Sequence, residues 1–209
     1  MTKRSEQQSS RGYASKKVGV QGKRVVETHP LTLSLAVLLG WLTLGAAIFW
    51  TEVREYYLYF TTPRVALSFN FQELSDNWGE AELKSFFEGA DLFCLKNEDV
   101  ALGDRRCYLD INAYNDAPAM GIGFFLSNGK LQYASVNVPI WAHGKMHDTV
   151  TQHHGASSFY SGRMGAEPLD IWRLPGGSSL FMSRDPARHL VKWHQLFWAS
   201  DRVCKELGC

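Results

Sequence analysis

Several signatures of catalysis and of nucleic-acid binding are missing from this chain of 209 residues. It has no His-Glu-x-x-His motif, which would indicate a zinc metalloprotease, and no Gly-x-Ser-x-Gly motif, which would indicate a serine hydrolase. Its four cysteines lack the paired spacing of a metal site. No motif therefore names a reaction, and neither a catalytic residue nor a cofactor is predicted.

Charged side chains are absent between Pro30 and Thr51. The run from Leu31 to Trp50 contains seven leucines, and about 20 apolar residues in a helix suffice to cross the hydrocarbon core of a bilayer. We therefore expect one N-terminal transmembrane helix, within a segment of residues 30–60 that includes a juxtamembrane extension. Two alternatives are a buried core helix, which is usually shorter and polar on one face, and a cleaved signal peptide, whose apolar core has roughly 7 to 15 residues.

Large apolar side chains are almost absent from residues 1–29, which predicts a disordered tail. This segment contains seven Lys or Arg and two Asp or Glu, a charge of +5, whereas the rest of the chain carries −4. The positive-inside rule places such a basic tail in the cytoplasm and residues 64–209 on the other side of the membrane. The negative charge of this large domain argues against a nucleic-acid partner, because phosphate binding needs clustered bases.

Aromatic residues gather after the apolar run, where the helix would leave the bilayer and where their rings favour the headgroup layer. They are Phe49, Trp50, Tyr56, Tyr57, Tyr59 and Phe60. No Asn-x-Ser/Thr glycosylation acceptor follows them, which favours a bacterial envelope over a eukaryotic secretory lumen. The expected location is the bacterial inner membrane, in a single pass, with the C-terminal domain in the periplasm and the lipid bilayer as one partner.

All four cysteines lie in the outward domain, as expected for folding in an oxidising compartment. Four cysteines allow three pairings. We favour a disulfide between Cys94 and Cys107, which closes a short loop between a helical stretch and a strand. Cys204 and Cys209 are then either joined near the carboxyl end or free, and four buried thiols are the alternative.

The pattern of the outward domain is typical of a small α+β fold with an antiparallel sheet of hairpins and short helices. Alternating apolar residues predict strands, and Asn128-Gly129 between two such runs predicts a tight hairpin. The expected elements are a strand at 65–71, a helix at 79–90 capped from 75–78, a three-stranded meander at 105–140, a helix at 142–156 stopped by Gly155, a hairpin at 168–183 and a last helix at 200–207. The run at 190–200 fits a strand or a helix, and we favour a strand.

The predicted elements follow the order helix, glycine turn, loop and hairpin twice, at 78–139 and at 147–197. Two hairpins, at 123–135 and at 170–183, place an apolar strand, a glycine turn and a second strand in the same register. A duplicated helix-hairpin module is therefore one interpretation of the domain, although unrelated hairpins also match in this way.

A histidine cluster is the one group of residues that suggests chemistry. His143 and His147 are four residues apart and would share one face of a helix, as zinc ligands do when a third ligand converges on them. However, Gly144 follows the first histidine where a zinc protease has its glutamate. The alternatives are histidines on the exposed side of a short helix, or a surface that responds to pH.

Tryptophan is abundant, with seven residues in the chain, five of them after the apolar run. Large aromatic side chains are enriched both in cores and in protein interfaces. Trp141, Trp172 and Trp193 are the candidates for a binding surface, and membership of the core is the alternative for each.

The expected function is that of a membrane-anchored extracytoplasmic protein, which acts as a protein-binding or scaffold subunit of an envelope complex. Its partner would be another envelope protein or a second copy of this chain. The alternative is a small membrane-tethered, metal-dependent hydrolase that uses the segment His143–His154. A sensory domain is less well supported, because the polar tail is too short to hold an output domain.

Overall fold

The computed structural model describes residues 30–98, 100–160, 168–186 and 193–209. The tail predicted at 1–29 lies outside the described residues. The chain divides into two compact units, Met1–Leu44 and Gly45–Cys209.

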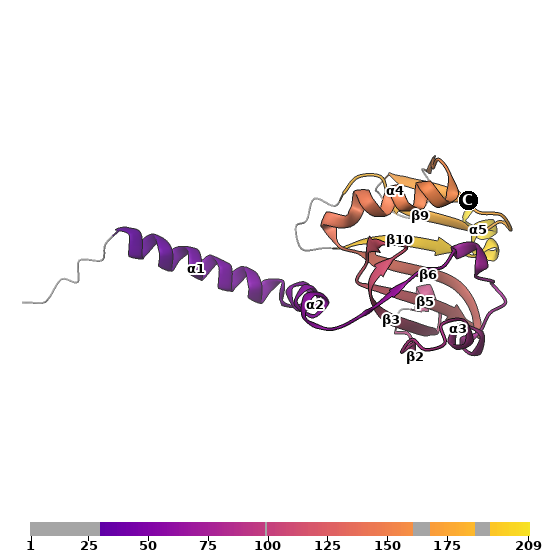
Figure 1. Cartoon of the computed structure of the whole chain (residues 1–209), viewed down its shortest axis with the longest axis horizontal. Coiled ribbons are helices and arrows are strands. Elements are labelled where there is room, and N and C mark those ends of the chain that lie inside the picture. Colours follow the sequence, from indigo (N-terminus) through magenta and orange to yellow (C-terminus); the bar gives the residue numbers. More distant parts are fainter. Residues whose placement is uncertain (1–29, 99, 161–167, 187–192) are drawn as a thin grey trace, which may run out of the picture. The chain divides into compact units, whose positions relative to one another are not determined.

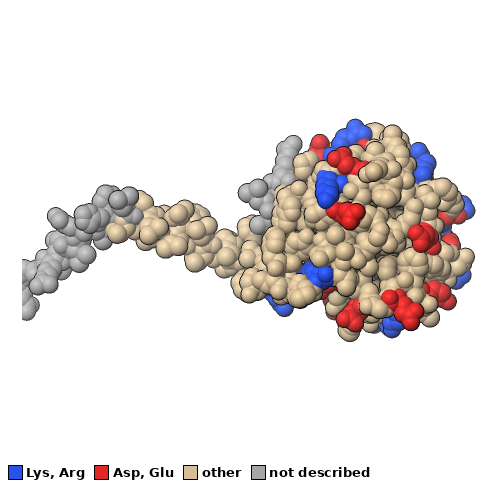
Figure 2. All heavy atoms as spheres, in the orientation of Figure 1, with Lys and Arg blue, Asp and Glu red and all other residues tan. Residues whose placement is uncertain are grey.

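Two consecutive helices, α1 (Pro30–Ile48) and α2 (Trp50–Thr61), follow the tail. The large apolar side chains of α1 are exposed, and its described part carries no charged residue (Figure 2). In the described part of the chain, no single helix is long and apolar enough to cross a membrane, whereas α1 and α2 meet the criterion as a pair with a break at Phe49. The helix α2 ends at the C-cap residue Thr62, directly before Pro63, because the residue before a proline disfavours the helical conformation.

The folded unit is a mixed α/β structure built on one large sheet (Figure 1). Its described strands are β1 (Val65–Leu67), β2 (Phe93–Lys96), β3 (Arg105–Tyr114), β4 (Ala117–Pro118), β5 (Gly121–Ser127), β6 (Lys130–Val138), β7 (Ser158–Tyr160), β8 (Leu169–Arg173), β9 (Ser179–Ser183) and β10 (His194–Ala199). They lie in the order β1-β3-β5-β6-β10-β9-β8-β7, and β2 and β4 also pair with β3. The strands β6 and β10, far apart in the sequence, are thus antiparallel neighbours at the centre.

The predicted meander is confirmed by the antiparallel pairs β3–β5 and β5–β6. The turn between β5 and β6 has positive φ at both Asn128 (51°) and Gly129 (73°), as a type I′ turn requires. The second predicted hairpin, β8–β9, is also present, and so is the strand β10.

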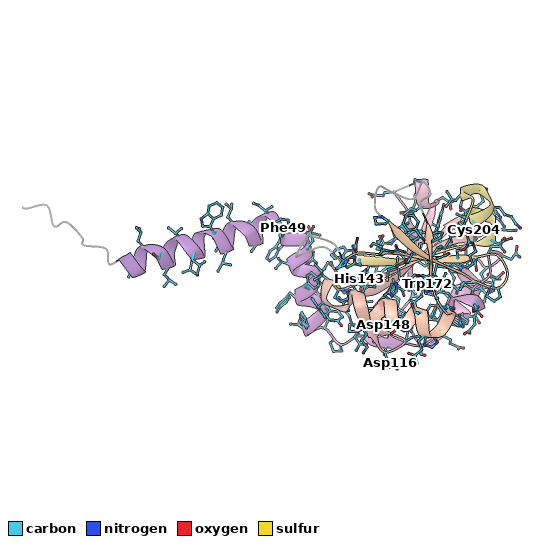
Figure 3. All side chains as sticks on the ribbon, turned by 90° about the horizontal axis from the view of Figure 1, so that it is seen from above. Phe49, Asp116, His143, Asp148, Trp172 and Cys204 are labelled. Atoms are coloured by element: carbon cyan, nitrogen blue, oxygen red, sulfur yellow. A yellow bond between two sulfur atoms is a disulfide. The ribbon has the colours of Figure 1, made fainter. Side chains whose placement is uncertain are left out.

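Three helices cover the sheet: α3 (Glu80–Phe86), α4 (His143–His154) and α5 (Asp201–Leu207). Leu83 of α3 and Met146 of α4 belong to the main core, which fills one face. On the other face, α5 places Val203 and Cys204 in a smaller apolar cluster. Figure 3 shows the sheet nearly edge-on, with Trp172 on the side of α4 and Cys204 on the side of α5. The described residues therefore cover the second face only in part.

Some sequence predictions were wrong in detail. The sheet is mixed rather than antiparallel, because β1 runs parallel to β3. The strand predicted at 65–71 ends at Leu67, since the Asn70 side chain accepts a hydrogen bond from the Gln72 N–H and starts a 3₁₀ turn at Phe71–Glu73.

The N-cap of α3 is Gly79 rather than a residue of 75–78, and the Glu82 carboxylate accepts its N–H. Glycine offers no side-chain cap, so the carboxylate that reaches back supplies the missing acceptor. In contrast, α4 ends at Gly155 as predicted. The predicted last helix is present as α5, and the hydroxyl of its N-cap residue Ser200 accepts the N–H of Val203.

Candidate functional site

The candidate site is a cavity of about 580 Å³ within the folded unit. Its floor is the part of the sheet that α5 leaves open, and one of its walls is α2. Residues from the sheet that line it include Tyr108, Gly123 and Ser135, which alternate along their strands with core residues such as Cys107, Phe124 and Val136. Because successive side chains of a strand point to opposite faces, the cavity lies on the face away from α4.

Two glycines of β5 leave room for this cavity. The register places Gly123 between Tyr108 and Ser135, and Gly121 next to Asn137. A Cβ atom at Gly123 would come within 3.4 Å of the Phe125 ring and of the Ser135 hydroxyl. Glycine within a strand often marks a close approach of a ligand or of another backbone.

Arg64 is the most deeply placed charge at the cavity. Its side chain is only 3% exposed, and its Nη1 donates a hydrogen bond of 2.5 Å to the Met120 carbonyl. The carboxylate of Asp110 lies 3.9 Å from the same nitrogen, and the Tyr59 ring packs on the guanidinium. The Arg64 Nε is buried without a hydrogen-bond partner among the described residues. Arg64 thus has one unused donor.

A second arginine, a glutamate and side-chain amides also line the cavity. Arg106 stacks its guanidinium over the Tyr108 and Phe125 rings, and Glu55 projects from α2. In the part of the chain that the structure describes, neither Arg106 nor Glu55 forms an ion pair. Gln195 donates a hydrogen bond to the Asn137 side-chain carbonyl (3.3 Å). The cavity therefore offers two cations, two anions and several neutral polar groups.

The three tryptophan candidates have three different environments. Trp193 lines the cavity and is half-buried. Trp172 is buried in the core, where its Nε1 donates to the Gly155 carbonyl. Trp141 is exposed but stacks on Tyr56 and Phe60 of α2. Only Trp193 is thus a candidate for the cavity, since Trp172 is a core residue and Trp141 holds α2 to the folded unit.

The two histidines considered as metal ligands do not converge. His143 is buried, and its Nε2 lies 2.8 Å from the Ser183 carbonyl oxygen. The Nε2 of His147 lies 3.1 Å from the Asp170 carboxylate, which also accepts hydrogen bonds from Arg184. Because each ring nitrogen facing the sheet already has its own acceptor, this pair forms no shared metal site. The expectation that the histidines lie on an exposed helix face is wrong for His143.

The Asp170 carboxylate is the centre of this buried network. Burial alone would raise its pKa, but the hydrogen bonds from Arg184 and His147 outweigh burial, and the pKa of Asp170 falls below its ordinary value. A lowered carboxyl pKa with both partners in place indicates a structural ion pair.

Elsewhere in the described chain, three potential metal ligands meet only at Glu80, Cys94 and Cys107. The two cysteines there are joined in a disulfide.

The predicted disulfide between Cys94 and Cys107 is present. Cys94 lies on β2, opposite Cys107 on β3, so the bond joins two strands rather than a helix and a strand. Cys204 and Cys209 are not bonded to each other. Burial and the neighbouring Cys204 raise the pKa of the Cys209 thiol above its ordinary value.

Sequence reasoning missed Arg64, Arg106, Gln195 and the glycines of β5. The signal for the glycines was present, because Gly121-x-Gly123 within an apolar strand points to close approach on one face. No local signal marked Arg64, whose place depends on how α2 and β3 pack around it. No protein family, no curated protein and no solved structure matches this chain.

Proposed function

We propose that this chain is a membrane-anchored extracytoplasmic protein, which serves as a protein-binding or scaffold subunit of a bacterial envelope complex. The anchor is the apolar segment of α1 and its continuation into α2. Two features support this anchor: the chain has no charged side chain between Pro30 and Thr51, and large side chains such as Leu33 and Ile48 are exposed along α1. Exposed apolar residues in such number need an apolar environment, which a bilayer supplies.

One observation carries the proposal of protein binding, an exposed apolar surface on the open face of the sheet. It consists of Phe93 and Leu95 on β2 and Tyr108 on β3, and we call it the β2 surface. Phe93 is 57% exposed, and its ring packs edge-on against Tyr108. Large aromatic residues on a rigid sheet are typical centres of protein interfaces.

The strand that carries this surface is also an edge strand. Among the described strands, β2 pairs with β3 alone. The disulfide fixes β2 to β3, so its apolar residues are held in place. An edge strand can accept a strand of another chain, and this suits a partner that is another envelope protein or a second copy.

The test is a crosslinking pull-down of the full chain from its native membrane, read by mass spectrometry. We expect a defined set of envelope proteins with the wild type and their loss with Phe93→Ser. The matched control is Phe159→Ser on β7, because Phe159 is also exposed (58%) but lies away from the β2 surface. A monomer that recovers no stoichiometric partner contradicts the proposal.

We also propose that the folded domain arose by duplication of one module. The support is the topology, in which a helix is followed by four strands, first as α3-β2-β3-β5-β6 with the short β4 inserted, then as α4-β7-β8-β9-β10. The strand order of the second half is the reverse of the first, so that β6 and β10 meet at the centre. Two equal modules related by a twofold axis would produce this order.

A further inference from the structure

Among the described residues that line the cavity, the positive and negative charges are equal in number. Arg64 and Arg106 provide two positive groups, and Glu55 and Asp110 provide two negative groups. A ligand with one sign of charge would meet two like charges as well as two opposite ones. A zwitterion can place each of its charges against an opposite group, which is the arrangement that electrostatic complementarity favours.

Arg64 is prepared to bind an oxyanion. Arg64 is almost completely buried, and its Nε has no hydrogen-bond partner among the described residues. A buried donor without an acceptor is unfavourable, and an oxygen of a bound phosphate or carboxylate would remove this cost. Arg106 of β3 also lines the cavity and supplies a second guanidinium, and arginine binds such groups through two parallel N–H donors.

The two carboxylates that line the cavity suit an ammonium group. The Asp110 carboxylate is 63% exposed and lies 3.9 Å from Arg64, too far for a hydrogen bond. Glu55 forms no ion pair with any described residue. Each carboxylate can therefore accept hydrogen bonds from a cationic ligand group.

The wall formed by α2 indicates where such a ligand comes from. Thr51, Glu55 and Leu58 of α2 face the cavity, while Trp50 and Tyr57 of the same helix are exposed. The apolar α1 ends one residue before α2 begins. Exposed aromatic rings next to a membrane segment favour the layer of lipid headgroups. A cavity bounded by this helix would be within reach of those headgroups.

From these observations we propose that the cavity binds the zwitterionic headgroup of a phospholipid of the phosphoethanolamine class. The phosphate lies against Arg64 and Arg106, and the ammonium lies against Glu55 and Asp110. The volume of about 580 Å³ accommodates a headgroup and its glycerol, since pockets for small ligands measure roughly 300–1,000 Å³. The choice of a lipid as the source rests on the proposed membrane anchor, whereas the charge pairing does not.

The test is a calorimetric titration of the full chain in non-ionic detergent micelles with sn-glycero-3-phosphoethanolamine, the soluble headgroup without acyl chains. We expect saturable binding that is at least about tenfold tighter than that of inorganic phosphate or of ethanolamine alone, since each carries only one of the two charges. Absence of saturable binding, or equal binding of inorganic phosphate, overturns the proposal. Binding of the monoester O-phosphoethanolamine but not of the diester overturns the lipid as the source.

Three variants locate the binding site. Gly123→Leu fills the cavity and is expected to abolish binding, with its fold checked by circular dichroism. Arg106→Gln removes one partner of the phosphate and is expected to weaken binding about tenfold. Arg202→Gln is the matched control, because Arg202 lies on α5 and pairs with Asp76 outside the cavity, and it should bind as the wild type does.

Wild-type affinity in both Gly123→Leu and Arg106→Gln would place the ligand elsewhere and contradict the proposal. The titration requires neither a bilayer nor a protein partner. Its failure is therefore distinguishable from failure of the pull-down, which tests the proposed function.

Discussion

At the scale of single residues, His194 is held where its charged form is unfavourable. Burial, and then the charge of His143, whose ring lies 4.5 Å away between centroids, lower the pKa of His194 to about 4 from its ordinary value of 6.5. His143 faces it from α4 and already contacts the Ser183 carbonyl oxygen. Both rings thus lie buried on the core side of the sheet.

This pKa predicts how stability depends on pH. Between pH 6.5 and about 4, the unfolded chain binds a proton at His194 that the folded chain does not bind. The free energy of unfolding should therefore fall as the pH is lowered through this window. Urea titrations at several pH values should show a shallower fall for His194→Gln, whereas the exposed control His153→Gln should keep the wild-type slope. Equal slopes in all three proteins would contradict the assignment.

At the scale of elements, the disulfide fixes β2 to β3. The two cysteines are 13 residues apart in the sequence, and closing a loop of this length stabilises a protein by about 3 kcal/mol. The double variant Cys94→Ala/Cys107→Ala should lose about that much in urea unfolding, and reduction of the wild type should have a similar effect. Cys209→Ser is the control and should unfold as the wild type does. An unchanged midpoint in the double variant would show that the bond does not support the strand pair.

The attachment of α2 depends on Trp141. Its ring lies 5.3 Å from Tyr56 and 5.7 Å from Phe60 between centroids, and an aromatic pair contributes about 1 kcal/mol. Trp141→Ala should therefore loosen α2 and speed tryptic cleavage after the exposed Arg54 at least about tenfold, as followed by gel electrophoresis in one detergent. Trp141→Phe, which keeps a ring, should be cleaved more slowly than Trp141→Ala. Identical cleavage rates in all three proteins would mean that α2 is held by other contacts.

The sequence predicted elements best where a local signal acts alone. Asn128-Gly129 specifies its hairpin because both residues tolerate positive φ, and Gly155 ends α4 for the same reason. The end of β1 was misplaced because the competing cap at Asn70 is a local interaction that alternation of apolar residues does not reveal.

The candidate site was less predictable than the elements, because it depends on residues far apart in the chain. Arg64 reaches the Met120 carbonyl across 56 positions, and Gln195 reaches Asn137 across 58. Gln195 and Asn137 meet because β10 pairs with β6, and no pattern within either strand specifies the other strand as its neighbour. The histidine pair shows the limit of a local pattern. His143 and His147 do lie on one helix, as their spacing predicts, but each ring has its own hydrogen-bond acceptor on the sheet, which the spacing does not reveal.

At the scale of the whole molecule, the two faces of the sheet differ. The face under α3 and α4 is the main core, whereas α5 covers the other face only over its own apolar cluster. The uncovered part carries both the cavity and the β2 surface, while Lys, Arg, Asp and Glu are interspersed on the side seen in Figure 2. Such a partly open face is where the proposed partner would bind if the domain is anchored as we propose.

The most direct test of this account is site-specific photocrosslinking in the native membrane. A photoreactive amino acid replaces Phe93 on the β2 surface in one version of the full chain and Phe159 on β7 in another. The account predicts one defined protein adduct from position 93, which mass spectrometry can identify, and none of the same mass from position 159. No adduct from either position, or the same adducts from both, would contradict a partner bound at the β2 surface.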